Sequence, residues 1–254
     1  MFKRCAHALL ALATSLGAQP ALENTGKPML VVYQCSAADT LAAGLGCSEE
    51  DPCQVYLELS NVDAAVSHIF VTGNIHTPMA TLYSVLLASQ DGGSTWNEPY
   101  PRMHSSGLDQ IQFVGDQNGW ISGANLQGAP RNPFLLITTD SGKTWREQPI
   151  FDEDRVAAIE RFSFDSPTTG TLWIDARLDG GTHELYKTQN GGANWAMERT
   201  SDDASQLGAE KQKSATGWRL RTDALTHSYV VEKSESSHWR RVASFLVDIA
   251  TCKE

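Results

Sequence analysis

The stretch Thr138-Thr139-Asp140-Ser141-Gly142-Lys143-Thr144-Trp145 decides the fold of this 254-residue chain. The pattern recurs from Ser89 to Trp96 and from Thr188 to Trp195, and a degenerate copy runs from Ser234 to Trp239. The four tryptophans follow one another at intervals of 49 (145 − 96), 50 (195 − 145) and 44 (239 − 195) residues. Self-similarity at such a period is typical of repeat architectures, in which each repeat forms one supersecondary unit.

Each copy lies between two stretches that alternate like β-strands, so we expect it to form a hairpin turn. The Asp or Asn side chain can accept hydrogen bonds from backbone N–H groups two residues on, the glycines allow positive φ, and the Thr hydroxyl can close the loop. The tryptophan then begins the next strand and can pack under the hairpin. These structural roles fall on Asp91, Gly93, Thr95, Trp96, Asp140, Gly142, Thr144, Trp145, Asn190, Gly192, Trp195 and Trp239.

Two further strands precede each hairpin at matching offsets. The strand that begins at Gly119-Trp120 aligns with those that begin at Gly170 and at Gly217-Trp218. Four strands in each repeat of 44 to 50 residues are typical of the blade of a β-propeller. We therefore predict an all-β fold, a small β-propeller of about four four-stranded blades.

The repeats resemble the BNR or Asp-box repeats of sialidase-like propellers. The unit of a Gly-Trp strand, a second strand and Thr-Thr-Asp-Ser-Gly-Lys-Thr-Trp is most similar to the photosystem II stability/assembly factor-like family. The resemblance covers residues 54 to 245 and implies a propeller with structural Asp-box hairpins. Members of that family are longer and usually seven-bladed, so a photosynthetic function is not carried over.

The N-terminal segment reads as a secretory signal over residues 1–18. Met1-Phe2-Lys3-Arg4 is a basic start, an apolar run follows, and small residues stand where a signal peptidase cuts. The run is shorter than the roughly 20 residues that span a bilayer, so we expect no membrane span in the mature chain and a periplasmic or extracellular location. Residues 19–53 then form an N-terminal segment with a cysteine loop, and residues 54–254 form the propeller.

Four cysteines remain after the signal, an even number that suits two disulfides and admits three pairings. We favour Cys35–Cys252, which would tie the N-terminal segment to the last blade, and Cys47–Cys53, which would pin a loop. The stretch 29–34 reads as one strand. We favour a ring of four blades closed by this strand, with a five-bladed ring or an open, dimerising array as the alternatives.

Charge and motifs restrict the function. The net charge of −10, from 20 basic and 30 acidic residues, disfavours a nucleic-acid partner and an anionic membrane surface. A sialidase-like enzyme would need an Arg-Ile-Pro segment and three clamp arginines, but Arg-Ile-Pro is absent and the first arginine after the signal is Arg102. We predict no catalytic residue, no cofactor and no metal site, and the acidic run Asp152-Glu153-Asp154 reads as a solvated loop.

Two classes of function remain, a protein-binding or assembly scaffold and, as the alternative, a glycan-binding protein or sialidase-like glycoside hydrolase. The stretches 73–79 and 125–133 depart from the repeat and should lie on one face, because both insert between the second and third strands of their blades. Their candidate contact residues are Asn74, His76, Gln127 and Arg131. We expect an exported, non-catalytic scaffold whose partner is another protein, with a dimer as one assembly.

Overall fold

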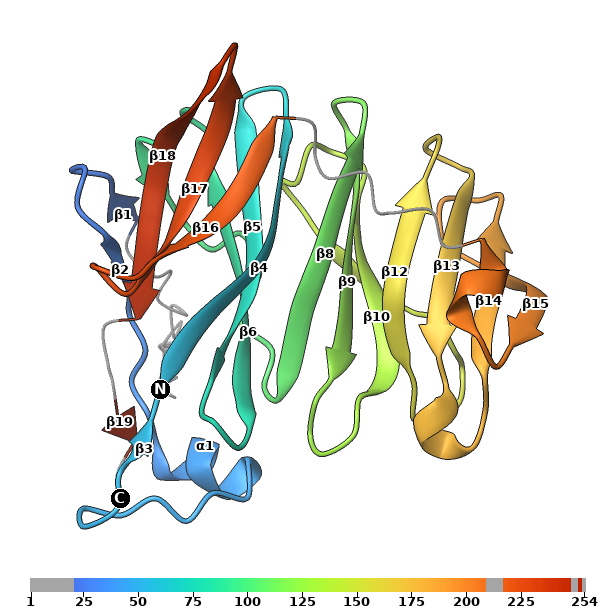
Figure 1. The fold of residues 1–254 in the computed structure, drawn as a ribbon, viewed down its shortest axis with the longest axis horizontal. Helices are drawn as coiled ribbons and strands as arrows, with labels where there is room; N and C mark the ends of the chain where they lie inside the picture. Colours follow the sequence, from blue (N-terminus) through green and yellow to red (C-terminus); the bar gives the residue numbers. More distant parts are fainter. Residues whose placement is uncertain (1–20, 209–216, 248–250, 253–254) are drawn as a thin grey trace, which may run out of the picture.

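The computed structural model describes residues 21–208, 217–247 and 251–252, which form a row of β-sheets standing side by side (Figure 1). The expected signal segment lies outside these residues. The helical elements of the described chain are α1 (Ala37–Ala42) and two short 3-10 turns, η1 (Arg177–Asp179) and η2 (Ala204–Leu207). None of them has the length and apolar character that crossing a membrane requires.

Three antiparallel sheets follow the first three sequence repeats. Sheet 1 comprises β4 (Tyr56–Ala65), β5 (His68–His76) and β6 (Thr81–Ser89). Sheet 2 comprises β8 (Ser106–Val114), β9 (Asn118–Asn125), β10 (Arg131–Thr138) and β11 (Arg146–Pro149). Sheet 3 comprises β12 (Ala158–Phe164), β13 (Gly170–Asp175), β14 (His183–Thr188) and β15 (Ala196–Ser201).

Sheet 1 has three strands instead of the expected four. The short strand β7 (Thr95–Trp96) pairs with β1 (Leu22–Glu23). Next to β7, Asn97 forms an isolated bridge with Ala88 of β6. The N-terminal segment therefore supplies an edge to the first repeat.

Sheet 4 comprises β16 (Trp218–Asp223), β17 (Ser228–Glu235), β18 (His238–Val247) and β2 (Met29–Val31). The strand β2 runs parallel to β18, with Met29 opposite Phe245. The stretch 29–34, expected to form one strand, thus supplies the fourth strand of this sheet through Met29–Val31.

Two disulfides fix the N-terminal segment. They join Cys35 to Cys252 and Cys47 to Cys53, which are the pairs favoured from the sequence. Around them, β3 (Cys53–Gln54) pairs with β19 (Thr251–Cys252). The strand β19 is thus held beside the start of sheet 1.

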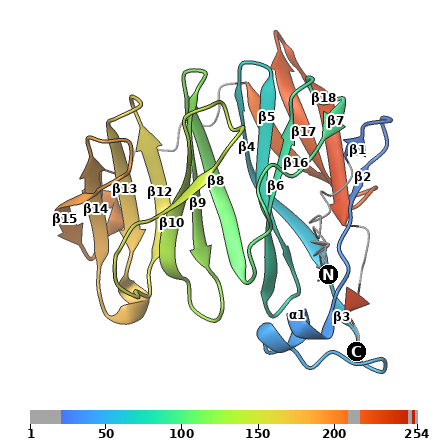
Figure 2. The same cartoon turned by 180° about the vertical axis from the view of Figure 1, so that it is seen from behind.

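The sheets do not close into a ring within the described residues, so the favoured closed ring is wrong. The order along the row is sheet 4, sheet 1, sheet 2, sheet 3, and sheets 4 and 3 lie at opposite ends in both views (Figures 1 and 2). Three apolar clusters lie between neighbouring sheets, whereas a closed ring of four needs four. Representative ring pairs are Trp96 with Phe245, Phe70 with Phe113, and Trp120 with Phe164, whose centroids are 5.0, 5.0 and 3.7 Å apart.

The outer face of sheet 3 contacts a short turn and not another sheet within the described residues. The turn η2 lies against this face, and Leu207 of η2 is buried. The indole Nε1 of Trp173 on β13 donates to the Leu207 carbonyl at 3.2 Å. The array is therefore open, with η2 over one end.

The hairpins after β6, β10 and β14 share one hydrogen-bond pattern. Asp140 Oδ1 accepts from the backbone N–H of Thr144 at 2.9 Å and from the Thr138 hydroxyl at 2.8 Å, and the Thr138 oxygen accepts from Gly142 N at 2.9 Å. In the first hairpin, Asp91 bonds the N–H groups of residues three and four places on. The expected bond to the residue two places on is wrong, because the carboxylate reaches across the whole turn.

These hairpins wedge into the neighbouring sheet through a glycine. A Cβ at Gly93 would lie 2.5 Å from Val242 in sheet 4, and one at Gly142 would lie 2.3 Å from Phe70 in sheet 1. Both glycines have positive φ, 100° and 76°. Both positions therefore require glycine for two reasons. The backbone φ is positive, and the neighbouring sheet leaves no room for a Cβ atom.

Candidate functional site

The first strand of each of sheets 1 to 3 carries a β-bulge at an equivalent place. The register shifts between Leu59 and Asn61 in β4, between Leu108 and Ile111 in β8, and between Ile159 and Arg161 in β12. A bulge adds a residue to one strand and can re-aim a side chain, and such bulges are common beside functional sites. No register shift interrupts the pairing of β16 with β17 in sheet 4.

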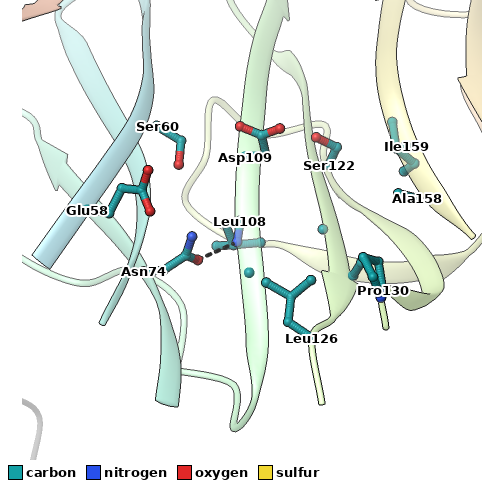
Figure 3. Close-up of a pocket in the computed structure, with 13 residues that line it drawn as sticks. Glu58, Ser60, Asn74, Leu108, Asp109, Ser122, Leu126, Pro130, Ala158 and Ile159 are labelled. Carbon is teal, nitrogen blue, oxygen red and sulfur yellow. Dashed lines mark hydrogen bonds between the residues drawn. The ribbon is translucent and has the colours of Figure 1, made fainter. Parts of the chain in front are cut away.

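Next to these bulges the three sheets form one hollow of about 260 Å³, which we call the inner hollow (Figure 3). It is partly apolar, since Leu108, Leu126, Pro130 and Ile159 contribute to its walls. Its other lining residues are Glu58, Ser60, Asn74, Gly107, Asp109, Ser122, Gly123, Ala124 and Ala158. The inner hollow therefore combines apolar walls with a few polar groups, as binding sites generally do.

Two carboxylates set the charge of the inner hollow. Glu58 of β4 and Asp109 of β8 are the charged residues of its lining, and no basic residue lines it. Partial burial raises the pKa of Asp109 above its usual range, and the negative charge of Glu58 adds to this effect. A bound cation would offset the repulsion between the two carboxylates, so the charge of the lining favours a positively charged group.

Side chains of sheet 2 fix the position of β12, the strand that contributes Ala158 and Ile159 to the inner hollow. Gln110 donates from Nε2 to the Phe162 carbonyl at 2.7 Å and accepts from Phe162 N–H at 3.0 Å. Gln112 does the same with Phe164, at 2.8 and 2.9 Å. These amides bond backbone N–H and C=O groups on the edge of β12 that faces sheet 2. Hydrogen bonds as well as packing therefore fix sheet 3 relative to sheet 2.

The expected contact residues take four different places. Asn74 lines the inner hollow, and its Oδ1 accepts from Leu108 N at 3.0 Å. His76 Nε2 lies 3.9 Å from Glu58 Oε2. Gln127 donates to the Ala42 carbonyl of α1 at 2.9 Å, and Arg131 lies 3.7 Å from Asp154.

The stretches expected as loops are shorter than predicted. Residues 73–76 continue β5, where Asn74 is paired with Glu58 on one side and Ser84 on the other, and residues 131–133 belong to β10. Side chains in these stretches are therefore held by the sheet. Only 77–80 and 126–130 connect the strands, and the latter contributes Leu126 and Pro130 to the hollow.

A third carboxylate, Asp39 of α1, is fully occupied by structural contacts. It accepts hydrogen bonds from the hydroxyls of Tyr83 and Tyr33, at 2.6 and 3.1 Å, and from Ser36 N at 3.0 Å. His104 Nε2 lies 3.0 Å from Oδ1, the oxygen that also accepts from Tyr83. These bonds lower the pKa of Asp39 against the opposing effect of burial, so the group anchors α1 as an anion.

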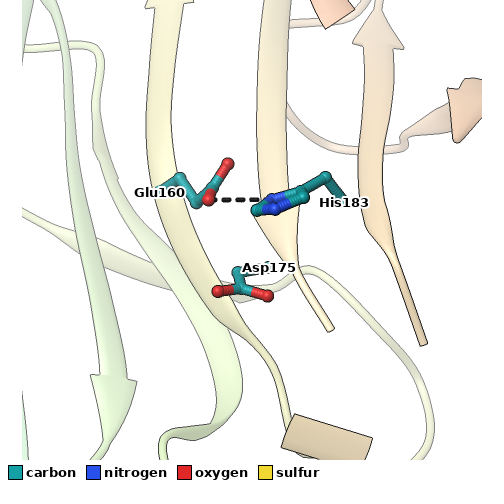
Figure 4. A group of neighbouring side chains, drawn as sticks. All are labelled: Glu160, Asp175 and His183. Carbon is teal, nitrogen blue, oxygen red and sulfur yellow. Dashed lines mark ion pairs between the residues drawn. The ribbon is translucent and has the colours of Figure 1, made fainter. Parts of the chain in front are cut away.

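A separate group of ionisable side chains lies outside the inner hollow, on sheet 3. Glu160, Asp175 and His183 each bring a possible ligand atom within 4.8 Å of the others (Figure 4). Neither this group nor the pairing of Glu58 with Asp109 was identified from the sequence. The bulges had one signal in the sequence. The residues at the three register shifts, Ser60, Gln110 and Glu160, follow one another at intervals of 50 (110 − 60, 160 − 110) residues.

The fold defines the class of this protein as an all-β, propeller-type array of repeated antiparallel sheets, similar to the photosystem II assembly factors. The chain is 26% identical over 163 residues to Photosystem II assembly lipoprotein Ycf48 of Synechococcus sp. (strain CC9902), covering 60% of this chain and 41% of that protein. It is 30% identical over 158 residues to Photosystem II stability/assembly factor HCF136, chloroplastic, of Arabidopsis thaliana, covering 57% of this chain and 32% of that protein. The chain thus spans less than half the length of these curated relatives.

Some of the similar proteins carry the names of enzymes. Chitin deacetylase 3 of Cryptococcus neoformans var. neoformans is 26% identical over 181 residues, covering 58% of this chain and 43% of that protein. Among solved structures, YCF48 from Cyanidioschyzon merolae matches with a TM-score of 0.41 and 17% identity, over 75% of this chain and 56% of that chain. No protein-family model matches the sequence.

Proposed function

We propose that this protein is an exported, non-catalytic scaffold that binds another protein through the inner hollow. The observation that carries the proposal is the gathering of residues from three separate repeats into one hollow beside the bulges of β4, β8 and β12, with polar side chains from the first two repeats and an apolar wall from the third. The assembly factors Ycf48 and HCF136, to which the chain is similar, support the same class of function. The two disulfides are in keeping with an oxidising compartment.

The size and charge of the inner hollow favour a polypeptide ligand. Its volume of about 260 Å³ is below the roughly 300 to 1,000 Å³ of small-molecule sites, so it suits one or two side chains of a larger partner. Glu58 and Asp109 provide two acceptors for a Lys or Arg side chain, and Leu126 and Pro130 offer apolar contact to its methylene stem. The partner segment is therefore expected to be basic.

A peptide array tests this proposal directly. The tag-free protein is applied to arrayed peptides in which one central position is varied among Lys, Arg, Gln and Glu. Wild-type protein should prefer Lys and Arg, and Glu58→Gln/Asp109→Asn should lose at least tenfold in affinity, because charge-assisted hydrogen bonds are each worth about 1.5 to 3 kcal/mol.

A charge-matched control separates local binding from net charge. Asp152→Asn/Glu153→Gln removes the same two negative charges from exposed positions and should bind as wild type does. Equal weakening by both double variants, or no preference for basic peptides, would contradict the proposal. Capture from the envelope fraction of the native organism then identifies the partner that carries the preferred segment.

A glycan-binding or glycoside-hydrolase function is the second candidate, because Glu58 and Asp109 are two carboxyl groups in one hollow and the pKa of Asp109 is raised. A sialic-acid clamp is not supported, since no arginine is among the lining residues. Fluorogenic sialosides and aryl glycosides, assayed from acid to neutral pH, should show no turnover. Turnover lost in Asp109→Asn would favour the enzyme.

A further inference from the structure

We propose that Glu160, Asp175 and His183 bind a divalent transition-metal ion, with zinc as the preferred ion. The three residues come from three adjacent strands of sheet 3, near one end of that sheet (Figure 4). Imidazole nitrogen and carboxylate oxygen are common zinc ligands, and three protein ligands leave a fourth position for water. This site is independent of the inner hollow.

The backbone explains why the three side chains meet. Asp175 and His183 are directly opposite each other in the antiparallel pair of β13 and β14, so their side chains share a face. Glu160 is the extra residue of the β12 bulge, since the register passes from Ile159 opposite Ile174 to Arg161 opposite Trp173. The bulge therefore adds a third ligand to a face that already carries two.

His183 provides the independent indication of a ligand. His183 is only 4% exposed, and its Nδ1 atom is buried without a hydrogen bond of acceptable geometry. Yet Glu160 Oε1 lies 2.9 Å from this nitrogen. A buried polar atom without a hydrogen bond is costly, and an ion bound between Nδ1 of His183 and the Glu160 carboxylate would satisfy both atoms.

The charges around the group are compatible with a cation. The Arg177 guanidinium donates to both carboxylate oxygens of Asp175, at 2.9 and 2.8 Å, and its backbone N–H donates to Oδ1 at 3.0 Å. Asp175 is therefore an anion at physiological pH. A carboxylate has about four acceptor positions and Arg177 uses three of them, so Asp175 can coordinate an ion through the remaining position while Arg177 orients it.

Calorimetric titration of the tag-free protein with zinc chloride tests the site. Wild-type protein should bind one ion, and the melting temperature should rise with zinc because the ion joins three strands of the folded state. His183→Ala and Glu160→Gln should each remove this saturable binding. Glu160 is exposed, so Glu160→Gln preserves the fold and keeps the test valid if His183→Ala does not fold.

A matched control lies on the hairpin of sheet 4. His238 Nε2 lies 3.8 Å from Glu235 Oε2, an exposed histidine and carboxylate pair without a buried imidazole. His238→Ala should leave zinc binding unchanged, and cobalt substitution should give a visible absorption band that Glu160→Gln abolishes. The proposal is overturned if wild-type protein shows no saturable binding, or if Glu160→Gln binds zinc as wild type does.

Discussion

The first and the fourth hairpins occupy equivalent positions in their repeats but have different surroundings. Trp96 of the first is 1% exposed, its Nε1 donates to the Gly93 carbonyl at 3.1 Å, and its ring packs edge-on against Phe245 of sheet 4. Trp239 of the fourth is 39% exposed and contacts Arg219 of its own sheet. The difference teaches that the hairpins that meet a neighbouring sheet carry Asp or Asn together with glycine, whereas the hairpin at the end of the array carries serines at these places.

The largest expected difference is between the two tryptophans. Trp96→Ala should lower the free energy of unfolding by about 3 to 5 kcal/mol, because it opens a cavity between sheets 1 and 4. Trp239→Ala should cost about 1 kcal/mol or less, the value of an exposed cation–π contact. Denaturant unfolding of both variants measures the two costs. Similar values would show that a neighbouring sheet covers the Trp239 hairpin, as sheet 4 covers the Trp96 hairpin.

The two adjacent glycines of the first hairpin give a smaller and sharper contrast. Both have positive φ, but a Cβ at Gly92 meets nothing within 4 Å, whereas one at Gly93 would lie 2.5 Å from Val242. Gly92→Ala should cost about 1 kcal/mol for the backbone alone. Gly93→Ala should cost about 3 kcal/mol, because overpacking adds to the same backbone effect. Equal melting temperatures would mean that the hairpin does not wedge into sheet 4.

The smallest of these effects concerns the carboxylate of the second hairpin. Asp140→Ala should lose about 1 to 2 kcal/mol through its hydrogen bonds, whereas Ser234→Ala at the equivalent place in the fourth hairpin should be nearly neutral. Hydrogen bonds from Thr144 lower the pKa of Asp140 from 3.8 to about 2. Because the folded-state pKa is depressed, this contribution is present above pH 3.8 and is lost as the pH falls toward 2.

The acid dependence can be measured by thermal unfolding between pH 5 and 2, a window set by that shift. Wild type should lose more stability over this range than Asp140→Ala, which lacks the titrating group. Parallel pH profiles for the two proteins would show that the Asp140 carboxylate is not bonded in the folded state.

The repeated hairpins could be predicted because their chemistry is local. Asp140, Gly142 and Trp145 act within one turn, so their spacing in the sequence reports their role. The place of Met29 beside sheet 4 was also accessible, since few residues remained to complete the last repeat. Whether the ring closes could not be predicted, because closure depends on how successive sheets pack and on the contact of Leu207 with sheet 3.

The candidate sites were hidden for a related reason. Glu58 and Asp109 are distant in the chain and line one hollow only because the bulged strands β4 and β8 lie side by side. A bulge changes the register without changing the apolar alternation enough to be noticed, so the turn of Glu160 toward His183 is invisible in the sequence pattern. Charged residues that appear solvated one by one can thus form a site when strands are aligned.

Amide hydrogen exchange of the four hairpins tests most directly whether the array is open. The N–H groups of Gly93, Gly142 and Gly192 are bonded to side-chain oxygens at 2.8, 2.9 and 3.1 Å and should exchange slowly. The turn at Ser236 and Ser237 should exchange rapidly at every protein concentration. Slow exchange of this fourth turn, equal to that of the other three, would show that a further sheet covers it and would contradict the open array.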